Sequence, residues 1–261
     1  MDKELYEGNI QKKISDIKLE FMQADASDIP ALLDKYSCDE RSGAVTICNQ
    51  YKARQEALQK ELNRLDNMKN YERKYQEYEF ICGIDEVGRG PFAGPVMACA
   101  IILPKDCNIL YINDSKQLSK KKREELYDEI ISSAISYGVG SVPPQRIDEI
   151  NILQATYEAM RQAILNLSIK PDILLNDAVT IPRVAIKQIP IIKGDAKSIS
   201  IAAASIVAKV TRDRIMITYD KVFPGYDFAG NKGYGSPNHI KAIQEMGLTP
   251  IHRRSFVKNI S

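Results

Sequence analysis

Histidine is scarce in this chain of 261 residues, which contains only His239 and His252. So few histidines argue against a histidine-rich zinc site and against a Ser-His-Asp catalytic triad. Any metal site must therefore be built from oxygen ligands, which are the ligands that magnesium, manganese and calcium prefer.

Paired cysteines are also lacking. The chain has five cysteines, an odd number, and no C-x-x-C pair. A chain of this length does not need disulfides to fold, so reduced thiols inside a cell are expected. We interpret all five as packing residues: Cys38, Cys48, Cys82, Cys99 and Cys107.

Long apolar runs and a targeting leader are missing as well. The longest apolar run, Val96 to Leu103, is far too short to cross a bilayer, and no basic-then-apolar segment opens the sequence. The net charge of +2 does not demand a polyanionic partner, and a hydrophobic content of 44% allows one large domain or two modest ones. These properties predict a soluble cytoplasmic protein.

The first 72 residues have the composition of a helical region. Their only glycines are Gly8 and Gly43 and their only proline is Pro30, while apolar residues from Tyr51 to Tyr71 recur at steps of three and four. Acidic and basic residues are interleaved along this segment, which favours a helical packing module over a nucleic-acid-binding arm. We therefore predict an N-terminal helical extension over residues 1–72 and a second domain over 73–261.

The second domain alternates strands and helices. The segments Phe80 to Ile84 and Val96 to Leu103 are apolar on both alternations apart from Gly83, which is typical of strands covered on both faces. Further strands are predicted near residues 137–142, 172–175 and 189–192, and helices near 119–134, 147–167 and 199–210. This order predicts an α/β fold with a mixed sheet and a helical C-terminal part.

Acidic residues end or follow three of the predicted strands. Asp85 comes after the first strand, and Asp177 and Asp195 follow two later ones, with Glu86 beside the first. If neighbouring strands carry these residues, their carboxylates meet at one edge of the sheet and can hold a metal ion.

Each acid also has a purely structural interpretation. Asp195 precedes a predicted helix and could cap it, Asp177 could open a turn, and Glu86 could pair with Arg89. The joint occurrence of all four acids beside a glycine-rich loop favours the metal site.

Gly88, Arg89 and Gly90 form that loop. They could be a simple turn, but glycines also allow the backbone to approach a sugar hydroxyl or a phosphate closely. A backbone that recognises hydroxyl groups can distinguish RNA from DNA, because the 2′-OH both donates and accepts hydrogen bonds.

A second glycine-rich segment, GNKGYGSPNH at 230–239, contains Lys232 and Tyr234. The tyrosine could be a surface lid, or its flat ring could pack on a sugar or base of any sequence. Near the end of the chain, Arg253 could bind a phosphate or lie in a solvated tail.

Six sequence blocks together resemble the bacterial ribonuclease HII family. They run in order from about residue 78 to 256: GIDEVGRGPFAGPV at 83–96, NDSKQLS at 113–119, LLNDAV at 174–179, KGDAKSISIAAASIVAKVTRDR at 193–214, KGYGSP at 232–237 and HRRSF at 252–256. One departure is Asn176, where an apolar residue is expected before the third acid. No equally strong signature occurs in residues 1–72.

The resemblance implies an RNase H-like fold and an endonuclease that cuts RNA/DNA hybrids and single ribonucleotides embedded in duplex DNA. Cleavage on the 5′ side of the ribonucleotide would leave 3′-hydroxyl and 5′-phosphate ends, with Mn²⁺ or Mg²⁺ as cofactor. The implied metal ligands and catalytic residues are Asp85, Glu86, Asp177 and Asp195. The predicted substrate contacts are Gly88, Arg89, Gly90, Ser115, Lys116, Lys232, Tyr234 and Arg253, and a monomer is the expected state.

Two alternatives remain at this stage. The sister family, ribonuclease HIII, needs several consecutive ribonucleotides, and the Gly-Arg-Gly loop containing Arg89 argues against it. A non-catalytic module that only binds hybrids would use the acids as helix caps and turns, and would release no products.

Overall fold

The computed structural model describes residues 12–260. The chain forms two compact units, and the boundary in the sequence falls between Asn63 and Arg64. This division falls inside one long helix, α3 (Ser42–Met68). The end of α3 and all of α4 (Asn70–Lys74) therefore belong to the second unit.

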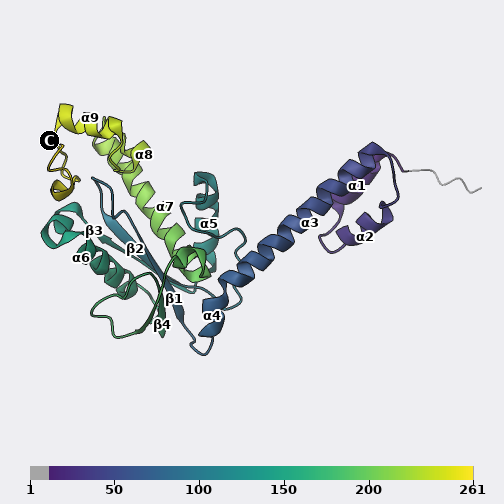
Figure 1. The fold of residues 1–261 in the computed structure, drawn as a ribbon, viewed down its shortest axis with the longest axis horizontal. Coiled ribbons are helices and arrows are strands. Elements are labelled where there is room, and N and C mark those ends of the chain that lie inside the picture. The colour runs from purple at the N-terminus through teal and green to yellow at the C-terminus, as the bar shows by residue number, and fades with distance from the viewer. Residues whose placement is uncertain (1–11, 261) are drawn as a thin grey trace, which may run out of the picture. The chain divides into compact units, whose positions relative to one another are not determined.

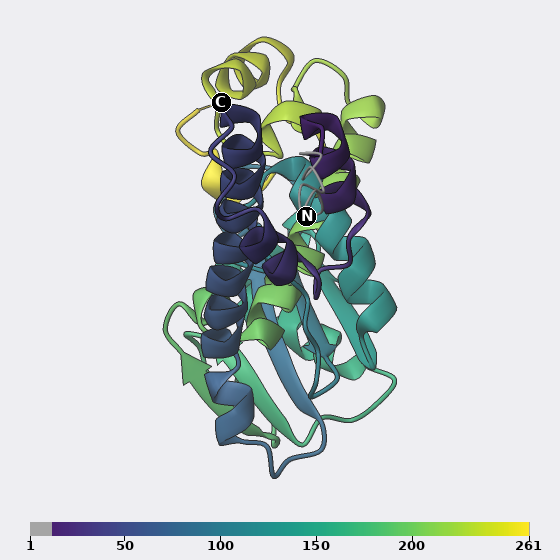
Figure 2. The ribbon, with the colours of Figure 1, turned by 90° about the vertical axis from the view of Figure 1, so that its right-hand side faces the viewer.

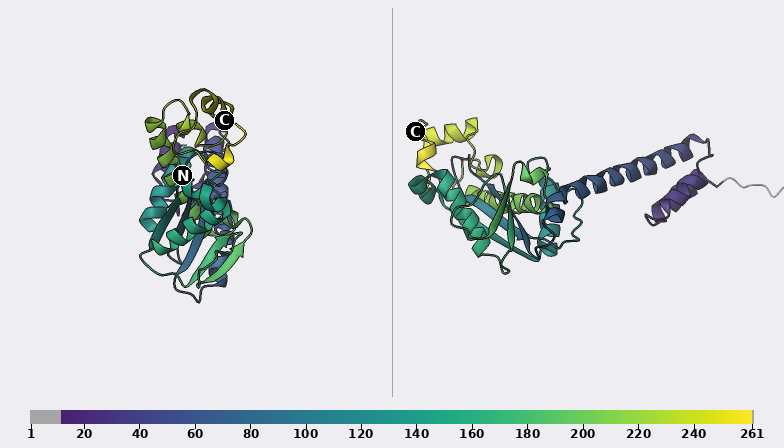
Figure 3. Two further views of the ribbon diagram at one scale, coloured as in Figure 1. Left: turned by 90° about the vertical axis from the view of Figure 1, so that its left-hand side faces the viewer. Right: turned by 60° about the horizontal axis from the view of Figure 1, so that its bottom comes forward.

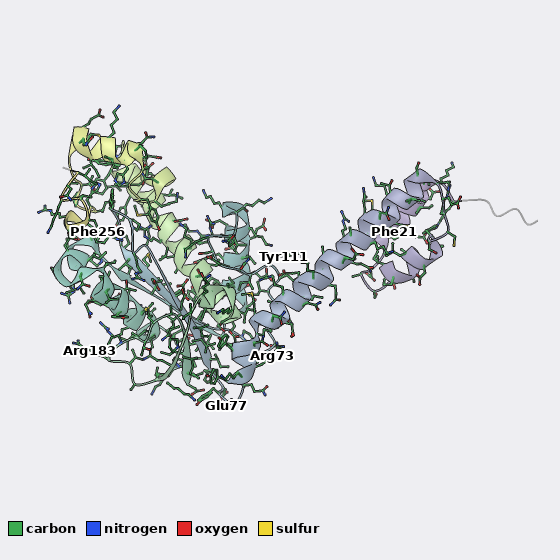
Figure 4. All side chains as sticks on the ribbon, viewed as in Figure 1. Phe21, Arg73, Glu77, Tyr111, Arg183 and Phe256 are labelled. Atoms are coloured by element: carbon green, nitrogen blue, oxygen red, sulfur yellow. The ribbon has the colours of Figure 1, made fainter. Side chains whose placement is uncertain are left out.

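The first unit consists of α1 (Ile14–Gln23), α2 (Ile29–Lys35) and most of α3. Its small core is centred on Phe21, whose ring lies 4.7 Å from that of Tyr51, and Figure 4 labels it. The predicted helical character is confirmed from Ile14 onward, and the part of that prediction covering residues 1–11 lies outside the described residues.

A five-stranded mixed sheet forms the centre of the second unit, with the strand order β3-β2-β1-β4-β5. β1 pairs antiparallel with β2, which pairs antiparallel with β3, whereas the β1–β4 and β4–β5 pairs are parallel. The strands are β1 (Ile81–Val87), β2 (Val96–Ile102), β3 (Ser136–Val142), β4 (Ile173–Asp177) and β5 (Lys187–Ile191). The predicted mixed α/β sheet is confirmed.

Helices cover both faces of this sheet, with α6 on one face and α7 on the other (Figure 1, Figure 2). The helices of this unit after α4 are α5 (Lys120–Ser133), α6 (Pro144–Leu165), α7 (Ile199–Val222), α8 (Phe228–Asn231) and α9 (Pro237–Met246), with short 3-10 turns η1 (Gly194–Ala196) and η2 (Arg254–Phe256).

A cluster of buried side chains lies between the sheet and the helices on each face. The α7-side cluster includes Cys99, Ile101, Ala203, Ile206 and Val210, and the α6-side cluster includes Cys82, Ile84, Ala98, Ala159 and Met160. Successive strand residues point to opposite faces, which explains why neighbours such as Ala98 and Cys99 belong to different clusters.

Gly83 explains how α7 approaches the sheet so closely. A Cβ atom at this position would lie 2.2 Å from the backbone carbon of Ser200, far inside van der Waals contact. The alanines and serines at the start of α7 are also small, which allows the helix to lie close to the sheet.

The N-terminus of α7 is held by a residue from α4. Oε1 of Glu72 accepts hydrogen bonds from Oγ of Ser198, 2.6 Å away, and from the backbone N–H of Ser200, 3.1 Å away. Because the first N–H groups of a helix have no partner within the helix, this carboxylate caps α7 from outside.

The C-terminal segment packs beyond one end of the sheet, where α8, α9 and η2 gather (Figure 3). Ala93 forms an isolated antiparallel bridge with His252, which joins this segment to the loop after β1. Phe256, labelled in Figure 4, packs against both the α6-side cluster and the C-terminal residues.

All five cysteines are free, and Cys82, Cys99 and Cys107 are buried, as expected of packing residues. Cys48 is partly buried, and Cys38 is exposed, so the packing interpretation is wrong for Cys38. Within residues 12–260, none of the helices is both long enough and apolar enough to cross a membrane.

Candidate active site

Asp85 and Glu86 lie inside β1, because this strand continues to Val87 instead of ending before the acids. Asp85 is opposite Cys99 of the α7-side cluster, while Glu86 is opposite Ala98 of the α6-side cluster. The two carboxylates therefore leave the strand on opposite faces, as alternation predicts.

Asp177 is the last residue of β4, the parallel neighbour of β1. Because Ile84 pairs with Asn176, the next residues along both strands bring Asp85 and Asp177 to the same end of the sheet and to the same face. Oδ1 of Asp177 accepts a hydrogen bond from the N–H of Gly194 at 2.7 Å.

Asp195 follows Gly194 directly and lies in η1, so the same hydrogen bond ties its turn to the end of β4. It is not the cap of α7, since Ser198 is the N-cap residue and accepts from the N–H of Ile201. The helix-cap interpretation of Asp195 is thus wrong.

The pKa values of these acids show how strongly they influence each other. Burial, followed by the charges of Glu86 and Asp177, raises the pKa of Asp85 well above its usual value. Burial also raises the pKa of Glu86, although Arg89, whose NH1 lies 3.2 Å from Oε1 of Glu86, opposes the rise. Burial and then the charges of Asp114 and Asp177 raise the pKa of Asp195. A cation would relieve this repulsion.

The donor set fits a hard divalent cation such as Mg²⁺ or Mn²⁺, since it offers carboxylate oxygens and neither histidine nor cysteine. The side chains do not form a finished cage: over residues 12–260, no three His, Cys, Asp or Glu residues are clustered closely enough to hold one ion. The fit therefore rests on the ligand type and on the mutual repulsion of the acids.

A cavity of about 270 Å³ opens beside Asp85 and Glu86. Its other lining residues are Val87, Gly88, Arg89, Gly90, Ser115, Lys116, Ser205, Lys209 and Tyr234. It thus brings together the predicted glycine-rich loop, the serine and lysine of the NDSKQLS block, and the predicted packing tyrosine, from segments far apart in the chain.

Lys116 provides positive charge near Asp85, Asp177 and Asp195. Burial acts to lower its pKa, but Asp114, Asp85, Asp195 and Asp177 together raise it. This lysine stays protonated, in a position to attract a phosphate to the acidic site.

Sequence comparisons agree with this geometry. A family profile described as Ribonuclease HII matches residues 82–259, and a second, described as Ribonuclease HII N-terminal domain, matches residues 13–76. The chain belongs to the ribonuclease HII family. Ribonuclease HII of Lachnoclostridium phytofermentans is 64% identical over 249 residues, which cover 95% of this chain and 98% of that protein. Ribonuclease HII of Clostridioides difficile is 47% identical over 251 residues, again 95% and 98% of the two chains.

Solved structures of the ribonuclease HII type share the fold. The ribonuclease H2 of Pyrococcus horikoshii OT3 superposes with a TM-score of 0.58 at 30% identity, covering 69% of this chain and 96% of that one. Ribonuclease HII of Archaeoglobus fulgidus, solved in complex with PCNA, gives 0.56 at 27%, covering 67% and 93%. The predicted RNase H-like fold is confirmed, and family membership makes the chain a nuclease of the hydrolase class.

The structure corrects one predicted substrate contact of this ribonuclease HII chain, Arg253. It places another, Lys232, outside the lining of the cavity, and the substrate contact of that lysine stays a prediction. The side chain of Arg253 is fully buried and donates only to backbone carbonyls, so it cannot reach a phosphate. Lys232 sits in a left-handed conformation after α8, with its ammonium donating to the carbonyl of Ala229, and it does not line the cavity.

Ser205 and Lys209 line the cavity but were not predicted from the sequence. They are four residues apart on α7, so they share one face of that helix. Oγ of Ser205 lies 2.9 Å from Oγ of Ser115, and Nζ of Lys209 lies 2.7 Å from Oδ1 of Asp213. The sequence signal was a serine and a lysine interrupting the alanine-rich start of α7.

Proposed function

We propose that this chain is an endoribonuclease that hydrolyses the RNA strand of RNA/DNA hybrids and also cuts duplex DNA at a single embedded ribonucleotide. Cleavage falls on the 5′ side of the ribonucleotide and leaves 3′-hydroxyl and 5′-phosphate ends. One observation supports this function best: Asp85 and Asp177 lie at the same end of the sheet. Asp85 also lines a cavity together with Gly88, Arg89 and Gly90.

Asp85, Glu86, Asp177 and Asp195 are the residues that would hold Mn²⁺ or Mg²⁺. When bound, such ions lower the pKa of a water nucleophile and stabilise the leaving oxygen of a phosphodiester. Burial and then the neighbouring negative charges raise the pKa values of Asp85, Glu86 and Asp195, and the positive charge of the ions would offset both.

The substrate backbone lies in the cavity beside these acids. Lys116 and Lys209 line it and attract the phosphates, which otherwise would be repelled by the carboxylates. As phosphate contacts, both lysines contribute to affinity without reading the sequence.

The glycine-rich loop and Tyr234 distinguish the ribose. A Cβ atom at Gly90 would lie 3.8 Å from Cε1 of Tyr234, so the loop and the ring lie next to each other in the lining of the cavity. The loop offers backbone groups to the 2′-hydroxyl, while the tyrosine ring, 47% exposed, is free to pack on the neighbouring deoxyribose.

A single substrate tests this function. Duplex DNA carrying one ribonucleotide should be cut by the full chain in Mn²⁺ or Mg²⁺ but not in EDTA, and end-labelling should show the 5′-phosphate product. Cleavage only of tracts of several ribonucleotides would favour the ribonuclease HIII activity instead. Binding without products, with or without metal, would favour the non-catalytic module.

A further inference from the structure

Two fully buried arginines lie behind the loop that lines the cavity. Arg253 comes from the C-terminal segment and Arg212 from the middle of α7, and both side chains have an exposed fraction of 0%. An arginine buried to this extent is rare, because moving its charge out of water costs free energy unless every donor is satisfied.

Arg253 holds the glycine-rich loop by its backbone. Its Nε donates to the carbonyl of Gly94 at 3.0 Å and one terminal nitrogen donates to the carbonyl of Arg89 at 2.8 Å. The other terminal nitrogen donates to the carbonyl of Gly88. All three acceptors belong to the segment from Gly88 to Gly94, so one planar guanidinium fixes the direction of three peptide groups.

Arg212 joins the same loop to the segment that carries Tyr234. It donates to the carbonyls of Pro95 at 2.9 Å, Ala93 at 3.0 Å and Lys232 at 2.9 Å. A single side chain therefore connects the loop after β1 to the segment that precedes Tyr234.

Neither guanidinium forms an ion pair within the described part of the chain. Burial lowers the pKa of Arg212 to about 10, and burial followed by the charge of Arg212 lowers that of Arg253 to about 9, so both remain protonated at neutral pH. Two positive charges thus lie behind the loop, and their partners are carbonyl dipoles instead of carboxylates.

The direction of the carbonyls determines the direction of the amides. In a trans peptide the C=O and the following N–H point to opposite sides. The carbonyls of Gly88 and Arg89 point inward to Arg253, so the N–H groups of Arg89 and Gly90 point outward. Over residues 12–260 neither of these two amides has a hydrogen-bond acceptor, and both residues line the cavity.

We propose that Arg253, supported by Arg212, is a positioning residue that fixes the amides of Arg89 and Gly90 toward the substrate backbone and so sets the preference for a single ribonucleotide. This inference rests on the proposed function. The buried positive charge behind the loop strengthens the same amides as hydrogen-bond donors to phosphate and ribose oxygens.

The test compares Arg253→Lys and Arg212→Lys with Arg214→Lys as the matched control. Lysine keeps the positive charge but lacks the planar fork that reaches three carbonyls. Arg214 lies on α7 near Arg212, but its side chain is 47% exposed and pairs with Glu124 outside the cavity. Each protein is assayed on duplex DNA with one ribonucleotide and on a continuous RNA/DNA hybrid.

We expect Arg253→Lys to lower kcat/KM on the single-ribonucleotide duplex about tenfold more than on the continuous hybrid, mainly through KM. Arg214→Lys should leave both values and their ratio unchanged. A folded Arg253→Lys protein with the wild-type ratio would overturn the inference, because a purely structural role would lower the melting temperature without changing the ratio. If the wild-type chain cuts neither substrate, the proposed function itself fails.

A second measurement needs no variant of either arginine. In the Asp85→Asn protein, the backbone amide resonances of Arg89 and Gly90 are followed by NMR as the single-ribonucleotide duplex is added. Both resonances should shift more than they do with an all-DNA duplex of the same sequence. Equal shifts with the two duplexes would show that these amides do not sense the ribose, and would contradict the inference even if the arginine variants failed to fold.

Discussion

The two histidines of the chain share one hydrogen bond, with Nε2 of His239 and Nε2 of His252 separated by 3.0 Å. Nδ1 of His252 accepts from the backbone N–H of Thr249, so the proton of His252 is on Nε2 and is donated to His239. His239 then carries its own proton on Nδ1 and donates it to the carbonyl of Tyr234. Both rings are neutral, and together they connect the C-terminal segment to the loop of Tyr234.

This pair predicts that stability falls in weak acid. Burial and then the neighbouring His239 lower the pKa of His252 from 6.5 to about 4, and burial lowers that of His239. Between these pH values the unfolded chain binds protons that the folded chain does not, so the stabilisation is complete above pH 6.5 and is lost as the pH falls toward 4. For His252 alone the loss approaches roughly 3 kcal/mol.

Urea unfolding from pH 7 to pH 5 measures this effect. His252→Asn serves as the control, because asparagine can still accept from Thr249 but does not titrate. It should be less stable than the wild type at pH 7 and show a shallower decline in acid. Equal slopes for the two proteins would mean that the histidine pair is not responsible.

Replacing Asp85 should abolish activity but raise the stability of the metal-free protein. Asp85→Asn removes a charge that we propose holds metal, so cleavage should be lost while binding of the duplex largely remains. Burial and then the charges of Glu86 and Asp177 raise the pKa of Asp85, so without metal the neutral asparagine avoids both penalties and unfolding should cost about 1 kcal/mol more. Denaturation in EDTA and a cleavage assay check the two parts. A fully active variant would refute the assignment of Asp85.

The two glycines of the loop should respond differently to alanine. Gly88 has a φ of +84°, and a Cβ there would lie 2.3 Å from Nε of Arg212, so Gly88→Ala should destabilise the protein by about 2 kcal/mol or more. Gly90 has no positive φ and only the Tyr234 ring nearby, at 3.8 Å, so Gly90→Ala should change stability by less than about 1 kcal/mol. Thermal denaturation of both variants provides the comparison, and similar losses would contradict it.

The position of the domain boundary can be tested with two fragments. A fragment of residues 64–261 keeps Leu65 and Met68, which are buried in the α7-side cluster, and the cap that Glu72 gives to α7. A fragment of residues 73–261 loses all three, and it should be less stable by about 3 kcal/mol or more. If both fragments unfold at the same denaturant concentration, the end of α3 and α4 contribute nothing to the catalytic part.

Much of the fold could be predicted because its signals are local. The apolar runs of β1 and β2 and the small residues of α7 follow from periodicity and packing alone. The end of β1 was placed too early, since charged residues within a strand look like a loop in the sequence. The pairings of Asp85 with Cys99, Glu86 with Ala98 and Val87 with Met97 show that the strand continues.

The roles of the arginines could not be predicted in the same way. Arg253 looks like a solvent-exposed phosphate ligand because its neighbours in the sequence are basic. Its burial depends on carbonyls of Gly88 and Arg89, more than 160 residues away in the chain. A polar side chain in the core is defined by distant acceptors, and these do not show in its local sequence.

The missing side chain of Gly83 has a final consequence for how such a site can evolve. With only a hydrogen atom there, the main chain of α7 at Ser200 touches the strand that carries Asp85, and the turn of Asp195 comes just before the same helix. Any larger residue at this position would push the helix outward and draw the two aspartates apart. The spacing of these acids at one end of the sheet therefore depends on a position that has no side chain of its own.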